Sequence, residues 1–389
     1  MFDPIKASKE IKDSYIDYIT TTFDMADTDY EREFRKELQT DGMVASGPFL
    51  DIGGSYETGH TLRELIQAQK ASVLFESLEP VAEKERELKL DRPLYQHQEA
   101  AMLKAGKGEN LVVTTGTGSG KTESFLLPII DHLLREQEAG TLSAGVRAII
   151  IYPMNALAND QMKRMRALFK NYPQICYGVY NGNTEHTQSK ALAEYHRTYH
   201  DETGEPTDPA PNEIISREVM QERPPHILIT NYSMLEYMML RPKDDAVFSG
   251  AKLKFIVLDE AHIYKGATGM ETSLLMRRLR ARISEPDSVQ YILTSATLGG
   301  PDADGDILSF AEKLCGVAFQ RSGIIRSTEK RPAMEDYLDF APALFEELQK
   351  SPDISSVLAR YHADFAPGGS EDEKLYALFL HSRLFALLR

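Results

Sequence analysis

Cysteine is scarce in this chain: Cys176 and Cys315 are the only two among 389 residues, and no metal-ligand spacing joins them. Such usage is typical of a reducing compartment and argues against a zinc or iron–sulfur site within this sequence. The sequence also lacks an apolar run long enough to span a membrane, and residues 1–10 lack the apolar segment of a secretory signal. We therefore expect a cytoplasmic protein with no membrane partner.

Net positive charge is missing too, because 44 lysines and arginines face 59 aspartates and glutamates and give a net charge of −15. A nucleic-acid-binding surface is usually basic, so this balance by itself disfavours a nucleic-acid partner. Basic residues nevertheless gather at 163–170 and 277–282. Such runs are more often solvated helix faces than binding sites. Overall charge therefore leaves the partner open, and any nucleic-acid binding must be local.

Short apolar runs alternate with helical segments over residues 91–320, in a chain that is 42% hydrophobic. The predicted strands are Leu111–Thr114, Arg147–Tyr152, Ile175–Tyr180, Ile227–Thr230, Leu253–Leu258 and Gln290–Leu293. Apolar runs without polar alternation are typical of parallel strands that helices cover on both faces. We therefore predict an α/β domain with a doubly wound parallel sheet, whose ligands bind at the carboxyl ends of the strands.

The sequence on either side of this domain is mostly helical in pattern. The pattern of residues 1–90 predicts a mostly helical accessory region without a catalytic motif, and the pattern of residues 321–389 predicts a second helical segment. The last predicted helix is strongly apolar and runs to Arg389 without a cap. We therefore expect the natural chain to continue beyond this residue.

A polar, proline-rich stretch at about 185–225 interrupts the alternation of strands and helices. We expect it to be a solvent-exposed insertion. It contains His186, His196 and His200, and it contains no cysteine. A metal site is therefore about ten times less favoured than a plain insertion.

A glycine-rich stretch, Thr114-Thr-Gly-Thr-Gly-Ser-Gly-Lys-Thr122, joins a predicted strand to a predicted helix. This context is typical of a phosphate-binding loop, in which glycines let backbone N–H groups and a helix N-terminus face an anion. Lys121 would reach the β- and γ-phosphates of a nucleotide, and the Thr122 hydroxyl would bind Mg²⁺. Thr115 stands where the strict pattern has its first glycine. A plain glycine-rich turn is the alternative, at about one chance in twenty.

An acidic pair, Asp259 and Glu260, follows the apolar run Phe255–Leu258. In the same sheet as a phosphate-binding loop, Asp259 would hold Mg²⁺ through its water shell, and Glu260 would orient and deprotonate the attacking water. An acidic pair after a strand is a common turn when it stands alone. Its combination with Lys121 and Thr122 favours nucleotide hydrolysis.

These motifs, in this order, resemble those of superfamily 2 helicases of the DEAH type over roughly residues 94–300. The motifs that carry the resemblance are Leu94-Tyr-Gln-His-Gln98, Thr114–Thr122, Tyr152-Pro-Met-Asn-Ala-Leu-Ala-Asn-Asp-Gln161, Tyr180-Asn-Gly-Asn-Thr184, Thr230-Asn-Tyr-Ser-Met-Leu235, Leu258-Asp-Glu-Ala-His262 and Thr294-Ser-Ala-Thr297. The resemblance implies a RecA-like fold, ATP and Mg²⁺ as cofactors, and nucleic acid as a partner.

The resemblance also implies a role for each candidate site residue. The nucleotide contacts are Gln98, Thr117, Gly118, Ser119, Gly120, Lys121 and Thr122, and the metal is held by Thr122 and Asp259. Lys121, Asp259, Glu260 and His262 are catalytic; Pro153, Asn155, Gly182, Thr230, Asn231 and Tyr232 contact nucleic acid; Ser295 and Thr297 couple hydrolysis to movement. Helix capping is an equal alternative for Asn155 and Asn231 and an open one for Ser295 and Thr297. The alternative for His262 is a loop histidine with satisfied hydrogen bonds.

More narrowly, the segment from Leu258 to Leu279 is similar to a prokaryotic branch that includes the mitomycin-repair helicases and the phage-defence helicases of DISARM and Druantia type. Gly47-Pro48-Phe49 favours the defence helicases. We expect an ATP-dependent motor that acts on DNA in antiphage defence or DNA repair, with single-stranded DNA favoured over RNA and with defence or repair subunits as partners. An ATP-gated clamp that recruits effector subunits without unwinding, and an RNA helicase, are the alternatives.

A stretch of the form Gln-x-x-Gly-Arg-x-Gly-Arg is missing after Thr297. In the helicases that this chain resembles, such a stretch belongs to a second RecA-like domain that supplies arginine fingers. An arginine finger is worth about 10³–10⁵ in rate. We therefore expect this chain alone to bind nucleotide weakly and to hydrolyse it slowly.

Overall fold

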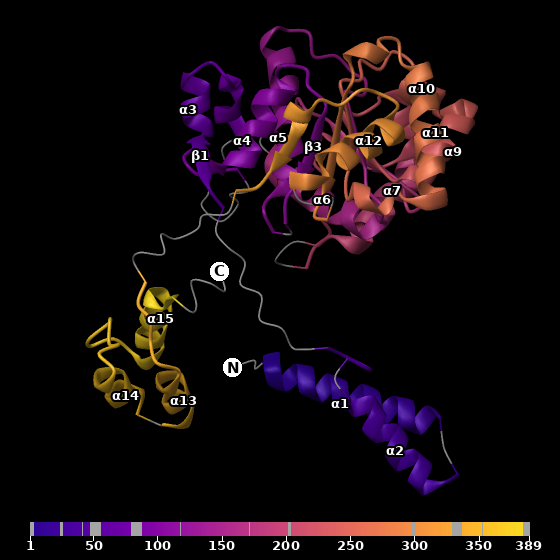
Figure 1. Ribbon diagram of the computed structural model, residues 1–389. Helices are drawn as coiled ribbons and strands as arrows, with labels where there is room; N and C mark the ends of the chain where they lie inside the picture. Colours follow the sequence, from indigo (N-terminus) through magenta and orange to yellow (C-terminus); the bar gives the residue numbers. More distant parts are fainter. Residues whose placement is uncertain are drawn as a thin grey trace. The chain divides into compact units, whose positions relative to one another are not determined.

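Figure 1 shows the computed structural model of the chain. The structure describes residues 4–23, 26–40, 42–46, 56–78, 88–116, 118–170, 172–200, 204–297, 301–328, 337–351 and 353–383. Residues 56–330 form one compact unit, and residues 1–55 and 331–389 are grouped apart from it. The segment Gly47-Pro48-Phe49 lies outside the described residues.

The unit of residues 56–330 is built on a sheet of eight strands in the order β10-β3-β9-β8-β4-β7-β5-β6. The strands are β3 (Leu111–Thr114), β4 (Ala148–Ile151), β5 (Tyr177–Tyr180), β6 (Glu213–Ile214), β7 (Ile227–Thr230), β8 (Phe255–Leu258), β9 (Gln290–Ser295) and β10 (Ile324–Arg326). All neighbouring pairs are parallel. The six predicted strands are present, whereas the edge strands β6 and β10 were not predicted because they are too short to show a pattern.

The register of the sheet brings the ends of separate strands to one edge. Thr114 at the end of β3 lies opposite Ser295 of β9. Ile151 at the end of β4 lies opposite Leu258 of β8 and Thr230 of β7. The loops after these strands therefore begin next to one another, although they are far apart in sequence.

Helices cover both faces of the sheet (Figure 1). They are α3 (Leu62–Gln67), α4 (Gln96–Ala105), α5 (Lys121–Glu138), α6 (Asn155–Phe169), α7 (Gln188–Thr198), α8 (Arg217–Glu222), α9 (Tyr232–Leu240), α10 (Asp245–Phe248), α11 (Gly266–Arg282) and α12 (Asp304–Cys315). One hydrophobic cluster packs α4, α5 and α6 against the sheet, and a second packs α9, α11 and α12. This arrangement confirms the predicted doubly wound, RecA-like α/β fold.

Residues 56–78 and 88–95 pack with the sheet rather than apart from it. β1 (Thr58–Thr61) pairs antiparallel with β2 (Pro93–Tyr95), and Phe75 is buried in the cluster that covers α5. The Ser72 backbone N–H donates to the Asp131 carboxylate of α5 over 2.7 Å. The compact unit therefore begins at Tyr56, and the region that we predict as an accessory region, residues 1–90, is divided between the two groups.

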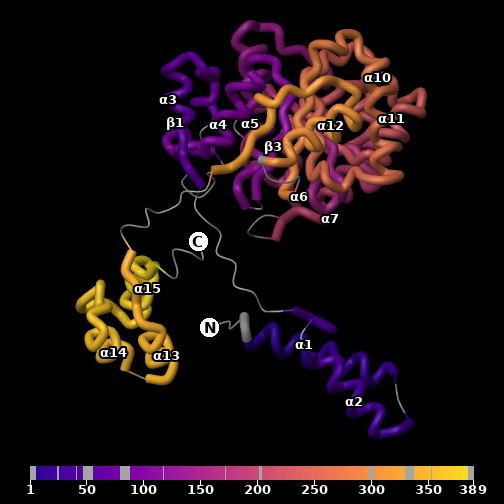
Figure 2. The backbone as a smooth tube through the Cα atoms, in the orientation of Figure 1, coloured from indigo at the N-terminus to yellow at the C-terminus, as the bar shows by residue number. Residues whose placement is uncertain are grey.

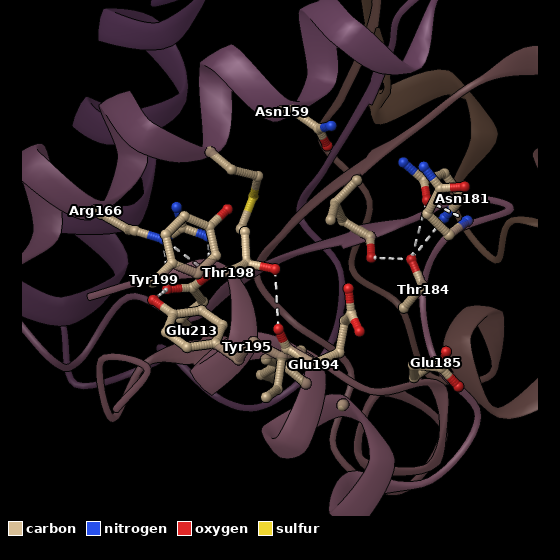
Figure 3. Close-up of a pocket in the computed structure, with 16 residues that line it drawn as sticks. Asn159, Arg166, Asn181, Thr184, Glu185, Glu194, Tyr195, Thr198, Tyr199 and Glu213 are labelled. Atoms are coloured by element: carbon tan, nitrogen blue, oxygen red, sulfur yellow. Dashed lines mark hydrogen bonds and ion pairs between the residues drawn. The ribbon is translucent and has the colours of Figure 1, made fainter. Parts of the chain in front are cut away.

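The stretch at 185–225, which we predict to be a solvent-exposed insertion, is folded where the structure describes it: much of it is exposed, but part of it is buried against the rest of the unit. β6 extends the sheet beyond β5, and α7 and α8 flank β6 in the sequence. Tyr195 of α7, Ile214 of β6 and Met220 of α8 are buried. Glu213 of β6 forms an ion pair with Arg166 of α6 at 2.7 Å (Figure 3). The sequence pattern does not reveal this partial burial, because the buried apolar residues are spaced too widely among polar ones to form a recognisable run.

The groups outside this unit are helical, as we predict. Their helices are α1 (Pro4–Thr22), α2 (Thr28–Gln39), α13 (Pro342–Lys350), α14 (Ile354–Arg360) and α15 (Glu371–His381), and Figure 2 traces their backbone. Asp27 caps α2, whereas α13, α14 and α15 enclose a small core around Leu344, Leu358 and Leu378. Within the described part of the chain, we find no helix with the length and apolar character needed to cross a membrane.

We expect Phe75→Ala to lower the free energy of unfolding of the 56–330 unit by about 3–5 kcal/mol, because it removes a buried ring and leaves a cavity. Denaturant unfolding followed by circular dichroism measures this change. Val73→Ala is the matched control, since Val73 lies in the same 3-10 turn with 53% of its surface exposed. It should change the stability by less than about 0.5 kcal/mol. Equal effects of the two substitutions would contradict the packing of this segment against α5.

Candidate active site

The phosphate-binding loop predicted from the sequence lies between β3 and α5, which begins at Lys121. Gly118 and Gly120 have φ angles of +75° and +74°, which residues with side chains rarely adopt. A Cβ atom at Gly120 would also lie 2.3 Å from the amide nitrogen of Gln98. Both glycines therefore suit the path of the loop, and Gly120 also allows its close approach to α4. Thr117, a predicted nucleotide contact, lies outside the described residues.

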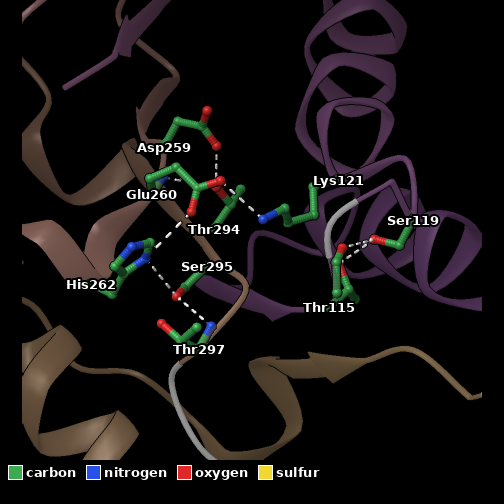
Figure 4. Close-up of polar contacts among 10 residues, drawn as sticks. Thr115, Ser119, Lys121, Asp259, Glu260, His262, Thr294, Ser295 and Thr297 are labelled. Carbon is green, nitrogen blue, oxygen red and sulfur yellow. Dashed lines mark hydrogen bonds and ion pairs between the residues drawn. The ribbon is translucent and has the colours of Figure 1, made fainter. Parts of the chain in front are cut away.

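A buried hydroxyl pair braces the loop from inside (Figure 4). Oγ of Ser119 lies 2.7 Å from Oγ1 of Thr115 and 2.8 Å from the carbonyl oxygen of Gly116. Thr115 is the residue that departs from the strict sequence pattern. Its hydroxyl provides a loop contact that a glycine at this position cannot make.

Two side chains of α4 hold the far end of the loop. Nε2 of Gln98 donates to the Gly120 carbonyl at 3.1 Å, and Oε1 accepts the Tyr95 backbone N–H at 3.0 Å. Nε2 of His97 lies 2.8 Å from the Ser119 carbonyl, which requires a proton on that nitrogen. Burial lowers the pKa of His97, so the neutral ring is favoured. Gln98 therefore reaches the loop, its contact with a base remains a prediction, and His97 is a loop contact that sequence reasoning did not select.

The predicted acidic pair meets the phosphate-binding loop (Figure 4). Nζ of Lys121 lies 3.0 Å from Oε1 of Glu260, although 139 positions separate the two residues. Asp259 accepts a short hydrogen bond from the hydroxyl of Thr294 in β9. The same Thr294 oxygen accepts the Glu260 backbone N–H at 3.3 Å. Thr294 therefore orients both acidic residues, a role that sequence reasoning did not assign to it.

The surroundings of Asp259 disfavour its charge. Burial raises the pKa of Asp259, the Thr294 hydrogen bond lowers it, the neighbouring Glu260 carboxylate raises it, and Lys121 lowers it, with a net upward shift. A hard cation stabilises such a carboxylate. Across the described ranges, no three His, Cys, Asp or Glu side chains gather into a metal site. The two predicted ligands, Thr122 and Asp259, fit Mg²⁺, which takes one or two protein oxygens and completes its shell with water and phosphate oxygens.

His262 connects the acidic pair to the segment after β9. Its Nδ1 lies 3.3 Å from Oε2 of Glu260 and 3.1 Å from the Ser295 hydroxyl oxygen. That oxygen also accepts the Thr297 backbone N–H at 3.1 Å. A continuous polar path therefore runs from Lys121 to Thr297, and the coupling role of Ser295 and Thr297 remains a prediction that this path supports.

The loops predicted to hold nucleic acid contact one another. Nδ2 of Asn231 donates to Oδ1 of Asn155 at 2.8 Å, which joins the loops after β7 and β4. Oδ1 of Asn231 accepts the Met234 backbone N–H at 2.8 Å and so caps α9. Asn155 is the first residue of α6, whose N-cap is Met154. The capping alternative therefore applies to Asn231 and not to Asn155.

The predicted nucleic-acid residues differ in exposure. Gly182 is exposed, and Pro153 and Tyr232 are partly exposed, so all three are open to a ligand. Thr230 is buried, and its hydroxyl donates to the Tyr180 carbonyl at 2.7 Å. The side chain of Thr230 therefore joins β7 to the end of β5, and it offers no contact to a ligand in this structure.

The sequence model of the DEAD/DEAH box helicase family matches residues 95–304, which is more than half of the chain. The match includes the phosphate-binding loop, the acidic pair and the segment after β9. The chain belongs to the DEAD/DEAH box helicase family. The resemblance that the sequence motifs indicate is thereby confirmed.

This helicase domain has much longer relatives. The Druantia protein DruE of Escherichia coli is 34% identical over 414 residues, an alignment that covers 83% of this chain and 22% of DruE. The ATP-dependent helicase HRQ1 of Saccharomyces cerevisiae is 29% identical over 213 residues, which cover 53% of this chain and 16% of HRQ1. The chain therefore spans less than a quarter of either relative. The similarity to DruE agrees with the Druantia-type resemblance of the motifs.

A solved helicase shares the fold. The DEAD-box helicase Mss116 bound to ssRNA and UDP-BeF is similar with a TM-score of 0.51 and 16% identity, over 81% of this chain and 56% of that chain. At this identity the likeness concerns the fold of the helicase domain alone.

We expect Asp259→Asn to raise the melting temperature of the helicase domain at pH 7, because the substitution removes a charge that burial disfavours. An acid with a raised pKa stabilises the fold only while protonated, and this contribution is lost as the pH rises through the folded-state pKa. The advantage of the variant should therefore grow as the pH rises from about 4. Thermal melts over a pH series measure it. Glu222→Gln, at an exposed carboxylate, should show no such trend, and a lower melting temperature for Asp259→Asn would refute the argument.

Proposed function

We propose that this chain carries the first motor domain of an ATP-dependent DNA helicase or translocase that acts in prokaryotic antiphage defence or DNA repair. The observation that carries the proposal is the 3.0 Å contact between Lys121 and Glu260. It unites a phosphate-binding loop with an acidic pair at one edge of the sheet, which is the arrangement that ATP hydrolysis requires.

The geometry suits hydrolysis of a bound ATP. Lys121 and the backbone of the loop would bind the phosphates, and because Lys121 contacts Glu260, the γ-phosphate would lie near that carboxylate. Glu260 would accept a proton from the attacking water. Thr122 and Asp259 would hold Mg²⁺, which neutralises charge on the phosphates. His262, 3.3 Å from Glu260, would restrict the carboxylate and transmit its position toward Ser295.

The loops after β4, β5 and β7 support a nucleic-acid partner. Their tips offer short polar side chains and backbone groups, which suit contacts with sugar and phosphate rather than with base edges. The loops are linked by the hydrogen bond between Asn231 and Asn155, so they would hold one strand as a unit. The similarity to DruE supports a defence role. The family resemblance of the motifs favours DNA, with single-stranded DNA favoured over RNA.

Turnover by this chain alone should be slow. The sequence after Thr297 contains no arginine-finger stretch of the kind that completes the ATP site in related motors. An arginine finger is worth about 10³–10⁵ in rate. We therefore propose that a second RecA-like domain is needed for full activity.

ATP hydrolysis should be near background for this chain with or without single-stranded DNA or RNA, while ATP still binds. A phosphate-release assay beside equilibrium binding of a fluorescent ATP analogue measures both properties, and Lys121→Ala should abolish the binding. DNA-stimulated turnover that Lys121→Ala removes would refute the need for a second domain and would identify DNA as the substrate. A strand-displacement assay then distinguishes a helicase from a clamp, because a clamp would hydrolyse ATP without displacing a strand.

In the full-length protein, we expect Glu260→Gln to lower the rate of ATP hydrolysis by about 10²–10⁴ and to leave ATP binding intact, because glutamine cannot accept the proton. Single-turnover hydrolysis and nucleotide binding measure the two effects. Glu236→Gln, which changes a carboxylate on α9 outside the site, is the control and should keep full activity. Preserved turnover in Glu260→Gln would contradict its assignment as the general base.

A further inference from the structure

The loop after β5, residues Asn181–Glu185, is held in shape by its own side chains and exposes only its tip. The Asn183 backbone N–H donates to Oδ1 of Asn181 at 2.9 Å, and the Asn181 backbone N–H donates to the Thr184 hydroxyl at 2.9 Å. Thr184 donates in turn to the Val179 carbonyl at 2.8 Å. Gly182 and Asn183 remain exposed. We call residues Asn181–Glu185 the β5 loop.

Arg217, the first residue of α8, contacts both ends of the β5 loop from below. Its Nη2 donates to the Asn181 carbonyl at 2.9 Å, and its backbone N–H donates to the Glu185 carbonyl at 3.0 Å. The guanidinium carbon lies 5.3 Å from the centre of the Tyr180 ring, and Nη1 lies 3.4 Å from Nε2 of His186. The Arg217 side chain therefore contacts Tyr180 at the end of β5, Asn181 at the start of the β5 loop, and His186 directly after the loop.

The charge of Arg217 is buried without a carboxylate to balance it. Only 6% of the residue is exposed, its Nε has no hydrogen-bond partner, and among the described residues no Asp or Glu lies within ion-pair distance. Other buried arginines differ: Arg147 pairs with Glu136 at 2.9 Å. An unbalanced charge is costly to bury, and a negative group bound at the exposed loop nearby would offset that cost.

The segment that carries Arg217 is fixed to the rest of the unit. Nη2 of Arg166 in α6 lies 2.7 Å from Glu213 of β6, whose side chain is 1% exposed, and the guanidinium carbon lies 4.3 Å from the Tyr199 ring centre (Figure 3). The Gln188 backbone N–H also donates to Glu218 of α8 at 2.9 Å. α7, β6 and α8 therefore form a base from which Arg217 acts on the β5 loop. Asn181, Thr184 and Glu185 of this loop line a cavity of about 250 Å³, and Arg166, Tyr199 and Glu213 line the same cavity.

We infer that Arg217 is a positioning residue for nucleic-acid binding: it holds the β5 loop in the shape that binds a strand and places a positive charge beneath the phosphate that the loop contacts. The inference rests on the proposed function, since it takes the β5 loop as a strand contact. It assigns a role to the 185–225 segment, whose α8 supplies this arginine. The partner is a phosphodiester backbone.

The test measures binding of a fluorescein-labelled oligothymidylate to the full chain by anisotropy. Arg217→Met should raise Kd about 10-fold, because a hydrogen bond from a charged donor is lost and the β5 loop is freed. Arg217→Lys, which keeps the charge and one donor, should recover part of the affinity. The slope of log Kd against log salt should stay the same, since a residue that neutralised a phosphate directly would reduce that slope by about 0.7. Affinity for the ATP analogue should not change.

Arg197→Met is the matched control, because Arg197 is an exposed arginine of α7 that pairs with Glu194. It should leave Kd unchanged. Hydrogen exchange of the free protein provides a second measurement: Arg217→Met should speed exchange at residues 181–185 and leave the phosphate-binding loop as in the wild type. A lower melting temperature with an unchanged Kd would overturn the inference and leave Arg217 a structural residue. Failure of the wild-type chain to bind oligothymidylate and oligouridylate would instead overturn the proposed function, and the inference with it.

Discussion

The parallel register of the sheet is the constraint on which the candidate site depends. β9 lies between β3 and β8, so Thr294 stands between the strand that leads into the phosphate-binding loop and the strand that leads into the acidic pair. Its hydroxyl reaches Asp259, while Lys121 reaches Glu260 from the first turn of α5. A slip of one residue in β9 would reverse the face of every side chain on that strand and would separate Thr294 from Asp259.

Polar contacts around the site are made by a small number of hydroxyl, amide and imidazole groups, some within one loop and others between loops. Ser119 braces the phosphate-binding loop, and His97 fixes its end to α4. Asn231 joins two loops at the edge of the sheet, and His262 connects the acidic pair with Ser295. These contacts tie the phosphate-binding loop to α4 and to the acidic pair, the acidic pair to the segment after β9, and the loops after β4 and β7 to each other.

Charge in this chain acts through its location and not through its sum. The net charge of −15 disfavours a broad basic surface. Arg166 and Arg217 are both removed from solvent to a large extent, yet Arg166 is neutralised by Glu213, whereas Arg217 has no carboxylate partner among the described residues. A buried charge with little screening acts over a longer distance than an exposed one. The burial and pairing of individual arginines, and not the net charge, therefore decide where this chain would attract an anion.

The sequence by itself determined the central strands, the glycine-rich loop and the acidic pair, because each is a run of adjacent residues and the order of the runs along the chain favours one interpretation over the alternatives. Tertiary structure alone decided that residues 56–78 pack with the sheet, that the 185–225 stretch is folded, and that Thr230 faces inward. It also selected His97, Thr294 and Arg217, whose partners lie 22, 35 and 36 positions away in the chain. A single polar residue has no periodicity to reveal its role, so only the folded chain, which brings its partner within hydrogen-bond distance, shows what it does.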